Sequence, residues 1–75
     1  MAVRPGAERE GVVVTWDDPR GWGVVRTEDG DDLPFHCTSL TDGSRSTEVG
    51  RAVRVVAGPG HHGHWEAVRV EPTGD

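Results

Sequence analysis

The chain has 75 residues, which is enough for one small domain. A second hydrophobic core is excluded, because a chain of this size buries only about 60% of the surface that it exposes when unfolded. Its formal net charge of −5 repels a polyanion at long range, so any nucleic-acid site must be local. The single cysteine, Cys37, excludes an internal disulfide. No apolar run is long enough to span a membrane, and residues 1–6 lack the apolar segment of a signal peptide, so we expect a cytoplasmic protein.

The first third of the chain predicts a tail followed by a β-hairpin. Because residues 1–10 contain proline, glycine and mixed charges and show no periodic pattern of apolar residues, we expect a flexible N-terminal tail. Residues 11–16 are β-branched and aromatic, as is typical of a strand with a buried face. Acidic residues and Pro19 then indicate a tight turn, after which residues 22–27 form a second strand.

A weaker strand and a long loop follow. Residues 33–37 predict a third strand, weakened by Pro34, which has no backbone donor. Residues 38–49 are polar and rich in turn formers, so they predict a long loop with room for one short helical turn. Leu40 is the expected hydrophobic anchor of this loop.

Two further strands complete the predicted fold. The side chains of residues 51–57 alternate between two faces, which predicts the fourth strand. Residues 64–70 follow a glycine-rich turn and predict the fifth strand, and residues 73–75 form a short tail. Five short strands and a long connection after the third predict an all-β domain over residues 11–72, a five-stranded antiparallel Greek-key barrel. An OB-fold barrel and an SH3-like barrel both fit this periodicity.

The most distinctive stretch is Arg20-Gly21-Trp22-Gly23. Glycines on either side of an indole leave bare backbone, so a planar group could lie flat on the ring of Trp22. Arg20 supplies a charge that could hold a phosphate. The alternative is that Trp22 is a core residue and that the glycines mark a bulge.

Several segments, taken in order, are similar to those of one known family. Residues 20–25 (Arg-Gly-Trp-Gly-Val-Val) are similar to a motif that is usually Lys-Gly-Phe-Gly-Phe-Ile, and residues 33–37 (Leu-Pro-Phe-His-Cys) to one that is usually Val-Phe-Val-His-Phe. Residues 14–16, 49–53 and 66–70 match further segments of the same family. From about residue 11 to residue 72 the chain thus resembles a cold-shock domain, an OB-fold that binds nucleic acid.

The resemblance implies a monomeric binder of single-stranded RNA or DNA, acting as an RNA chaperone or as a regulator of transcription or translation. The stacking positions that it preserves are Trp16, Trp22 and His36, with Arg20 beside them for phosphate. The phenylalanine that the family has in the loop near residue 45 is absent. At four further positions where the family has aromatic rings, this chain has Asp17, Val24, Pro34 and Cys37. We therefore expect weak binding with little base preference.

Four residues have alternative interpretations. Trp65 and Arg45 could compensate for the missing rings, but Trp65 equally suits a core or barrel-end position and Arg45 a solvated loop. Phe35 takes an inward position in the motif alignment and is expected in the core, whereas a shifted register would expose it. His36 could stack on a base or simply be solvated.

Catalysis and metal binding find little support in the sequence. No nucleophile elbow, phosphate-cradling loop or positioned carboxylate pair is present, so we expect no enzyme and no cofactor. His61, His62 and His64, even with Cys37, predict at most adventitious metal affinity in a glycine-rich turn. The competing hypothesis is a protein-interaction module on the same barrel, which binds a basic protein partner.

Overall fold

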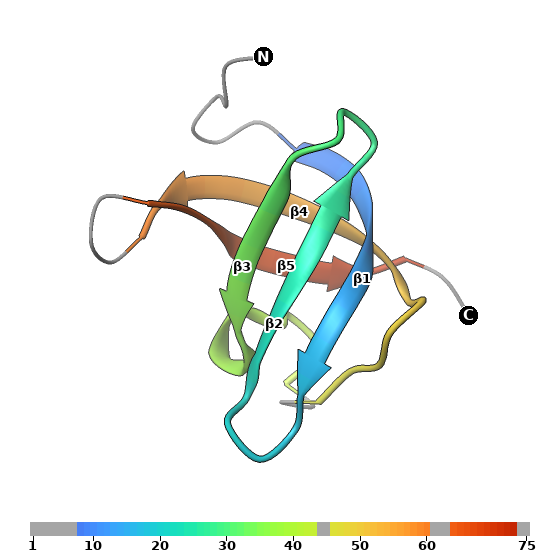
Figure 1. Cartoon of the computed structure of the whole chain (residues 1–75), viewed down its shortest axis with the longest axis vertical. Helices are drawn as coiled ribbons and strands as arrows, with labels where there is room; N and C mark the ends of the chain where they lie inside the picture. Colours follow the sequence, from blue (N-terminus) through green and yellow to red (C-terminus); the bar gives the residue numbers. More distant parts are fainter. Residues whose placement is uncertain (1–7, 44–45, 61–63, 74–75) are drawn as a thin grey trace.

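The computed structural model describes residues 8–43, 46–60 and 64–73. The described chain forms five β-strands and one short 3-10 helix: β1 (Glu8–Asp17), β2 (Trp22–Thr27), β3 (Asp32–His36), η1 (Cys37–Ser39), β4 (Ala52–Pro59) and β5 (Trp65–Pro72) (Figure 1). The all-β class and the short helical turn in the long loop are thus confirmed. Within the described ranges, no helix has the length and apolar character needed to cross a membrane.

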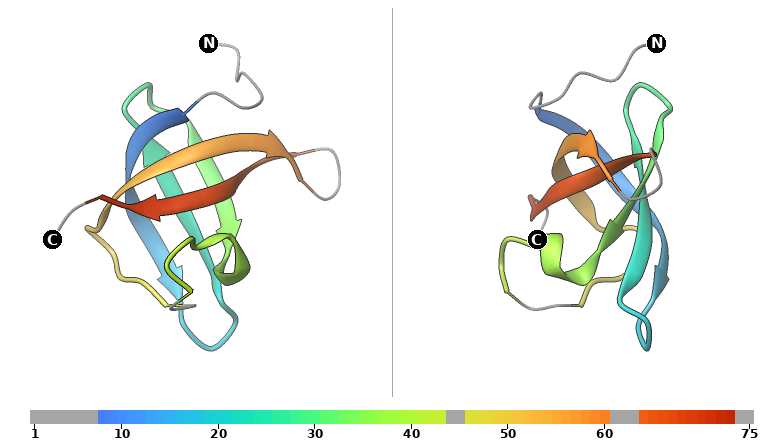
Figure 2. Two further views of the ribbon diagram at one scale, coloured as in Figure 1. Left: turned by 180° about the vertical axis from the view of Figure 1, so that it is seen from behind. Right: turned by 90° about the vertical axis from the view of Figure 1, so that its left-hand side faces the viewer.

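The five strands form one antiparallel sheet in the order β3-β2-β1-β4-β5. The strands β1, β2 and β3 lie side by side, and β4 and β5 cross behind them (Figures 1 and 2). The edge strands β3 and β5 contact each other, but no hydrogen-bonded ladder between described residues closes the sheet. An isolated parallel bridge between Leu40 and Val70 ties η1 to β5 instead.

The core lies between these two layers. Its buried hydrophobic residues are Val13, Val25, Leu33, Phe35, Leu40, Val53, Val55, Ala57, Ala67 and Val70. Phe35 is fully buried, as the motif alignment predicts, and Leu40 is the buried anchor of the loop. The alternation of β4 is also confirmed, since Val53, Val55 and Ala57 point inward.

A bulge in β1 changes which way its last residues face. Val13 pairs with Val25, but Thr15 pairs with Val24, so Val14 is an extra residue in the ladder. Trp16 consequently lies opposite Gly23, on the core side of the sheet.

The bounds of β1, β3, β4 and β5 differ from the sequence prediction by one to three residues. Cys37, predicted to end the third strand, begins η1. Residues 8–10, assigned to the flexible tail, belong to β1 and pair with β4. The strand forms without an apolar pattern because residues 8–10 pair with residues 54–56 of β4, and Arg9 also makes ion pairs with Asp29 and Asp31. The strands β4 and β5 each begin one residue later and end two residues later than predicted, at Pro59 and Pro72. Residues 1–7 and 74–75, the rest of the two predicted tails, lie outside the described residues.

We predict that Gly23→Ala lowers the free energy of unfolding by about 1–3 kcal/mol, measured by urea denaturation. A Cβ at this position would lie 2.6 Å from the backbone oxygen of Thr15 and 2.9 Å from the buried ring of Phe35, and neither can easily move. Gly58→Ala is the matched control. There the nearest atoms belong to the exposed side chain of Val68, at 3.1 Å, and can rotate away. Equal decreases in the free energy of unfolding of the two variants would contradict this description of the core.

Candidate nucleic-acid interface

One exposed aromatic pair lies on the outer face of the sheet. Trp22, the first residue of β2, is 40% exposed and pairs across the ladder with His36, the last residue of β3. The ring centroids are 4.9 Å apart with an interplanar angle of 70°, an edge-to-face arrangement. Two of the predicted stacking residues are thus brought together, and the alternative that Trp22 is a core residue is wrong.

The imidazole of His36 is held by the 3-10 turn that follows it. Its Nδ1 accepts a hydrogen bond from the backbone N–H of Thr38 at 3.3 Å and lies 3.0 Å from the Thr38 hydroxyl. An Nδ1 that accepts from a backbone amide carries no proton, so in the neutral ring the proton is on Nε2. The cap therefore orients the ring and leaves an N–H donor at its other nitrogen.

The two glycines that flank Trp22 are explained by packing. Gly21 has a φ of 70°, and a Cβ there would lie 2.9 Å from Sγ of Cys37. Gly23 leaves room for the ring of Phe35 on the inner side. Both glycines are buried, so these positions require glycine whether or not a ligand approaches Trp22.

Trp16 is not part of this pair. It is half-buried and packs against the core, where its ring stacks on Phe35 with centroids 5.7 Å apart and an interplanar angle of 17°. Its indole N–H donates to Oδ1 of Asp18 at 3.2 Å. The structure therefore separates Trp16 from Trp22 and His36, with which the resemblance groups it.

Arg20 lies in the turn between β1 and β2, close to the aromatic pair in sequence. Its side chain is 81% exposed, and its Nε is 3.8 Å from Oδ2 of Asp17. A long ion pair between exposed groups contributes little to stability. Arg20 can therefore leave Asp17 for a phosphate at low cost.

The other predicted site residues lie elsewhere. Trp65 is 38% exposed at the start of β5, opposite Pro59, and no ring contact with another described aromatic residue joins it to the pair. Arg45 lies outside the described residues, as do His61 and His62. No group of three metal-ligating side chains occurs within residues 8–43, 46–60 and 64–73.

The outer face beside Trp22 is aliphatic. Val24 pairs with Thr15 on one side and with Pro34 on the other, and both Val24 and Pro34 are half-buried. These are two of the positions at which the cold-shock family has aromatic rings. A strand of bases would therefore find a smooth surface there, without a ring on which to stack.

Most arginines of the described chain are bound to carboxylates. Arg26 donates two hydrogen bonds to Asp32, of 2.8 and 3.2 Å, and these lower the pKa of that carboxyl. Arg9 donates to Asp29 at 2.7 Å and to Asp31 at 2.9 Å. A phosphate would have to compete with these carboxylates for the guanidinium groups, so Arg9 and Arg26 offer little attraction to offset the net charge of −5.

Comparison with known proteins assigns no family. No family model matches the chain, and no curated protein matches its sequence. The cold-shock resemblance therefore depends on the motifs quoted above and stays a prediction.

We predict that Trp16→Ala lowers the free energy of unfolding by about 2–4 kcal/mol, because it removes the ring stacked on Phe35. Trp22→Ala should lower it by less than Trp16→Ala does, since the Trp22 indole is 40% exposed and its ring contact with His36 is edge-to-face. Urea denaturation of the two variants measures both values. A larger loss for Trp22→Ala would place Trp22, and not Trp16, in the core.

A second prediction concerns the ion pair between Arg26 and Asp32. Arg26→Gln should raise the pKa of Asp32 towards its ordinary value, as measured by carboxyl-carbon NMR during a pH titration. Because the pKa of Asp32 is lower in the folded state, its stabilising effect is complete above the ordinary aspartate range and is lost as the pH falls through the folded value. An unchanged Asp32 titration in the variant would show that the pair does not form in solution.

Proposed function

We propose that this domain binds single-stranded RNA or DNA weakly, by stacking bases on Trp22 and His36. The observation that carries the proposal is an indole, 40% exposed, set edge-on against a capped histidine on the outer face of a β-sheet. Solvent-exposed rings on a sheet are the usual stacking platform for unpaired bases.

The proposed fold is a Greek-key OB barrel of the cold-shock type. The strand order, the contact between β3 and β5, and the bridge between Leu40 and Val70 support a barrel that is nearly closed. The order of the motifs along the chain supports the choice of an OB-fold over an SH3-like barrel.

In the proposed mechanism one base lies on Trp22 and contacts the ring of His36. The N–H at Nε2 of His36 can donate to an oxygen or nitrogen on the edge of that base or its neighbour. Arg20 turns from Asp17 to the backbone phosphate. Stacking of this kind contributes about 1–3 kcal/mol per base and accepts any base.

Weak binding would suit a protein that must release its ligand readily. With aliphatic residues at Val24 and Pro34, only a short stretch of a strand is held. Transient stacking would compete with base pairing, as in an RNA chaperone or a regulator of transcription or translation that acts as a cytoplasmic monomer. These roles come from the family resemblance.

We predict saturable binding of a fluorescently labelled oligothymidylate or oligouridylate, measured by anisotropy, with affinity that falls steadily as salt rises. Trp22→Ala should weaken this binding about 5- to 150-fold, the equivalent of one stacked base.

Trp65→Ala is the matched control, because it removes an indole of nearly equal exposure that lies outside the pair. The control should change the affinity less than Trp22→Ala does. The proposal fails if Trp22→Ala binds as the parent domain does while the domain remains folded. It also fails if Trp65→Ala gives the larger loss.

A further inference from the structure

An apolar hollow of about 430 Å³ lies on the outer face of β1, away from the aromatic pair. Its apolar lining comes from Val12, Val14 and Ala52, and Val12 is 43% exposed. Glu10 and Glu28 also line it. Exposed valine on a sheet face is apolar surface that a partner could cover.

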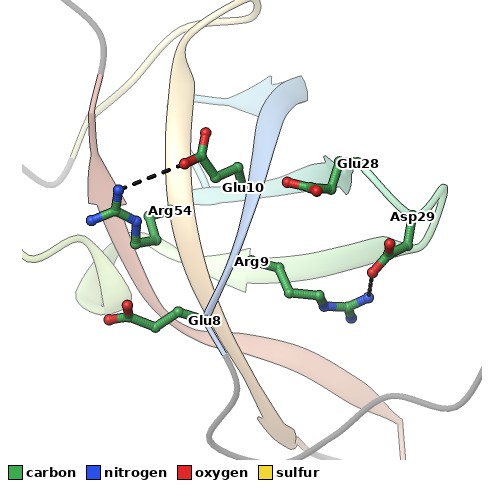
Figure 3. A pocket seen from close by; sticks show the side chains of 6 residues that line it. All are labelled: Glu8, Arg9, Glu10, Glu28, Asp29 and Arg54. Carbon is green, nitrogen blue, oxygen red and sulfur yellow. Dashed lines mark hydrogen bonds and ion pairs between the residues drawn. The ribbon is translucent and has the colours of Figure 1, made fainter.

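A second hollow, of about 360 Å³, adjoins the first. The two share Glu10 and Glu28, and the second is also lined by two carboxylates and two guanidinium groups, those of Glu8, Asp29, Arg9 and Arg54 (Figure 3). Together they form one groove, apolar over β1 and acidic near the N-terminal end of that strand. We call it the β1 groove.

The charge of the β1 groove is negative after its ion pairs are taken into account. Figure 3 shows the guanidinium groups of Arg9 and Arg54 directed to carboxylates, Arg9 to Asp29 and Arg54 to Glu10 at 3.6 Å. Arg26, which lines the apolar part, is held by Asp32.

Two carboxylates of the β1 groove remain uncompensated. Glu8 and Glu28 form no ion pair with any residue of the described ranges. The groove therefore repels an anion and complements a cation placed beside an apolar group.

We propose that the β1 groove binds an extended segment of a partner protein in which arginine or lysine side chains alternate with aliphatic ones. The aliphatic side chains would cover Val12, Val14 and Ala52, and a cationic side chain would lie at Glu28. Because β1 is already paired with β2 and β4, the segment cannot add to the sheet as a strand. The groove therefore recognises the partner segment through the side chains of that segment.

This inference does not rest on nucleic-acid binding. Trp22 begins β2 and Glu28 follows its end, so the acidic end of the groove is about 20 Å from Trp22 at 3.3 Å per residue. The apolar end is nearer, since Val14 precedes Thr15, which pairs with Val24. The domain can hold a strand of bases at one end and a basic peptide at the other. Each activity can be lost without the other.

The test uses a synthetic peptide of alternating arginine and valine, with a glutamate-valine peptide as the control ligand. Fluorescence anisotropy at low salt should show saturable binding of the basic peptide only. Backbone amide NMR shifts should cluster at Val12, Val14 and Ala52. Shifts spread over all acidic segments, or no saturation, would overturn the proposal.

Matched charge reversals separate a site from simple attraction by net charge. Glu28→Lys should weaken peptide binding at least fivefold, whereas Glu48→Lys, the same change on the exposed loop before β4, should weaken it less than twofold. Val12→Ser removes apolar surface without altering charge and should also weaken binding. Equal losses for the two lysine variants would overturn the proposal. Oligothymidylate binding measured on the same samples reports separately on Trp22.

Discussion

The structure depends on the close packing of Phe35 under Gly23. The buried ring occupies the space that any side chain at residue 23 would need, and Trp16 stacks on the same ring from β1. This contact joins the first three strands at one end of the sheet. Because consecutive residues of a strand face opposite ways, placing Gly23 inward directs Trp22 outward. The exposed indole is therefore a consequence of how the core is filled.

Charge divides the outer surface into two regions with different ligand preferences. Near Trp22 and His36 the described surface is aromatic and aliphatic, with one exposed carboxylate, Asp17, opposite Trp22 and loosely paired with Arg20. At the other end of β2, carboxylates outnumber the guanidinium groups that they bind, and the β1 groove is left acidic. A net charge of −5 is compatible with the proposed local site for bases, because much of the acidic excess lies at the opposite end of β2.

Sequence reasoning predicts those parts of the fold that follow from local patterns. The bounds of β2, the burial of Phe35 and the role of Leu40 follow from alternation and from motif register. Residues 8–10 could not be predicted as a strand, because they carry no apolar pattern and their partners, residues 54–56, are distant in the sequence. The bulge at Val14 leaves no sequence signal, and it is what turns Trp16 inward. Sequence reasoning does not predict the β1 groove either, because its acidic residues lie in segments whose composition indicates a turn or a tail.

In the proposed complex a single strand contacts Trp22 and His36 and not the inward-facing Trp16. Indole N–H resonances of the ¹⁵N-labelled domain, followed during titration with oligothymidylate, test it most directly. We expect the resonance of the Trp22 indole to shift to saturation together with those of the His36 ring, while the resonance of the Trp16 indole, which donates to Asp18, does not shift. A saturating shift of Trp16 with Trp22 unmoved would contradict it.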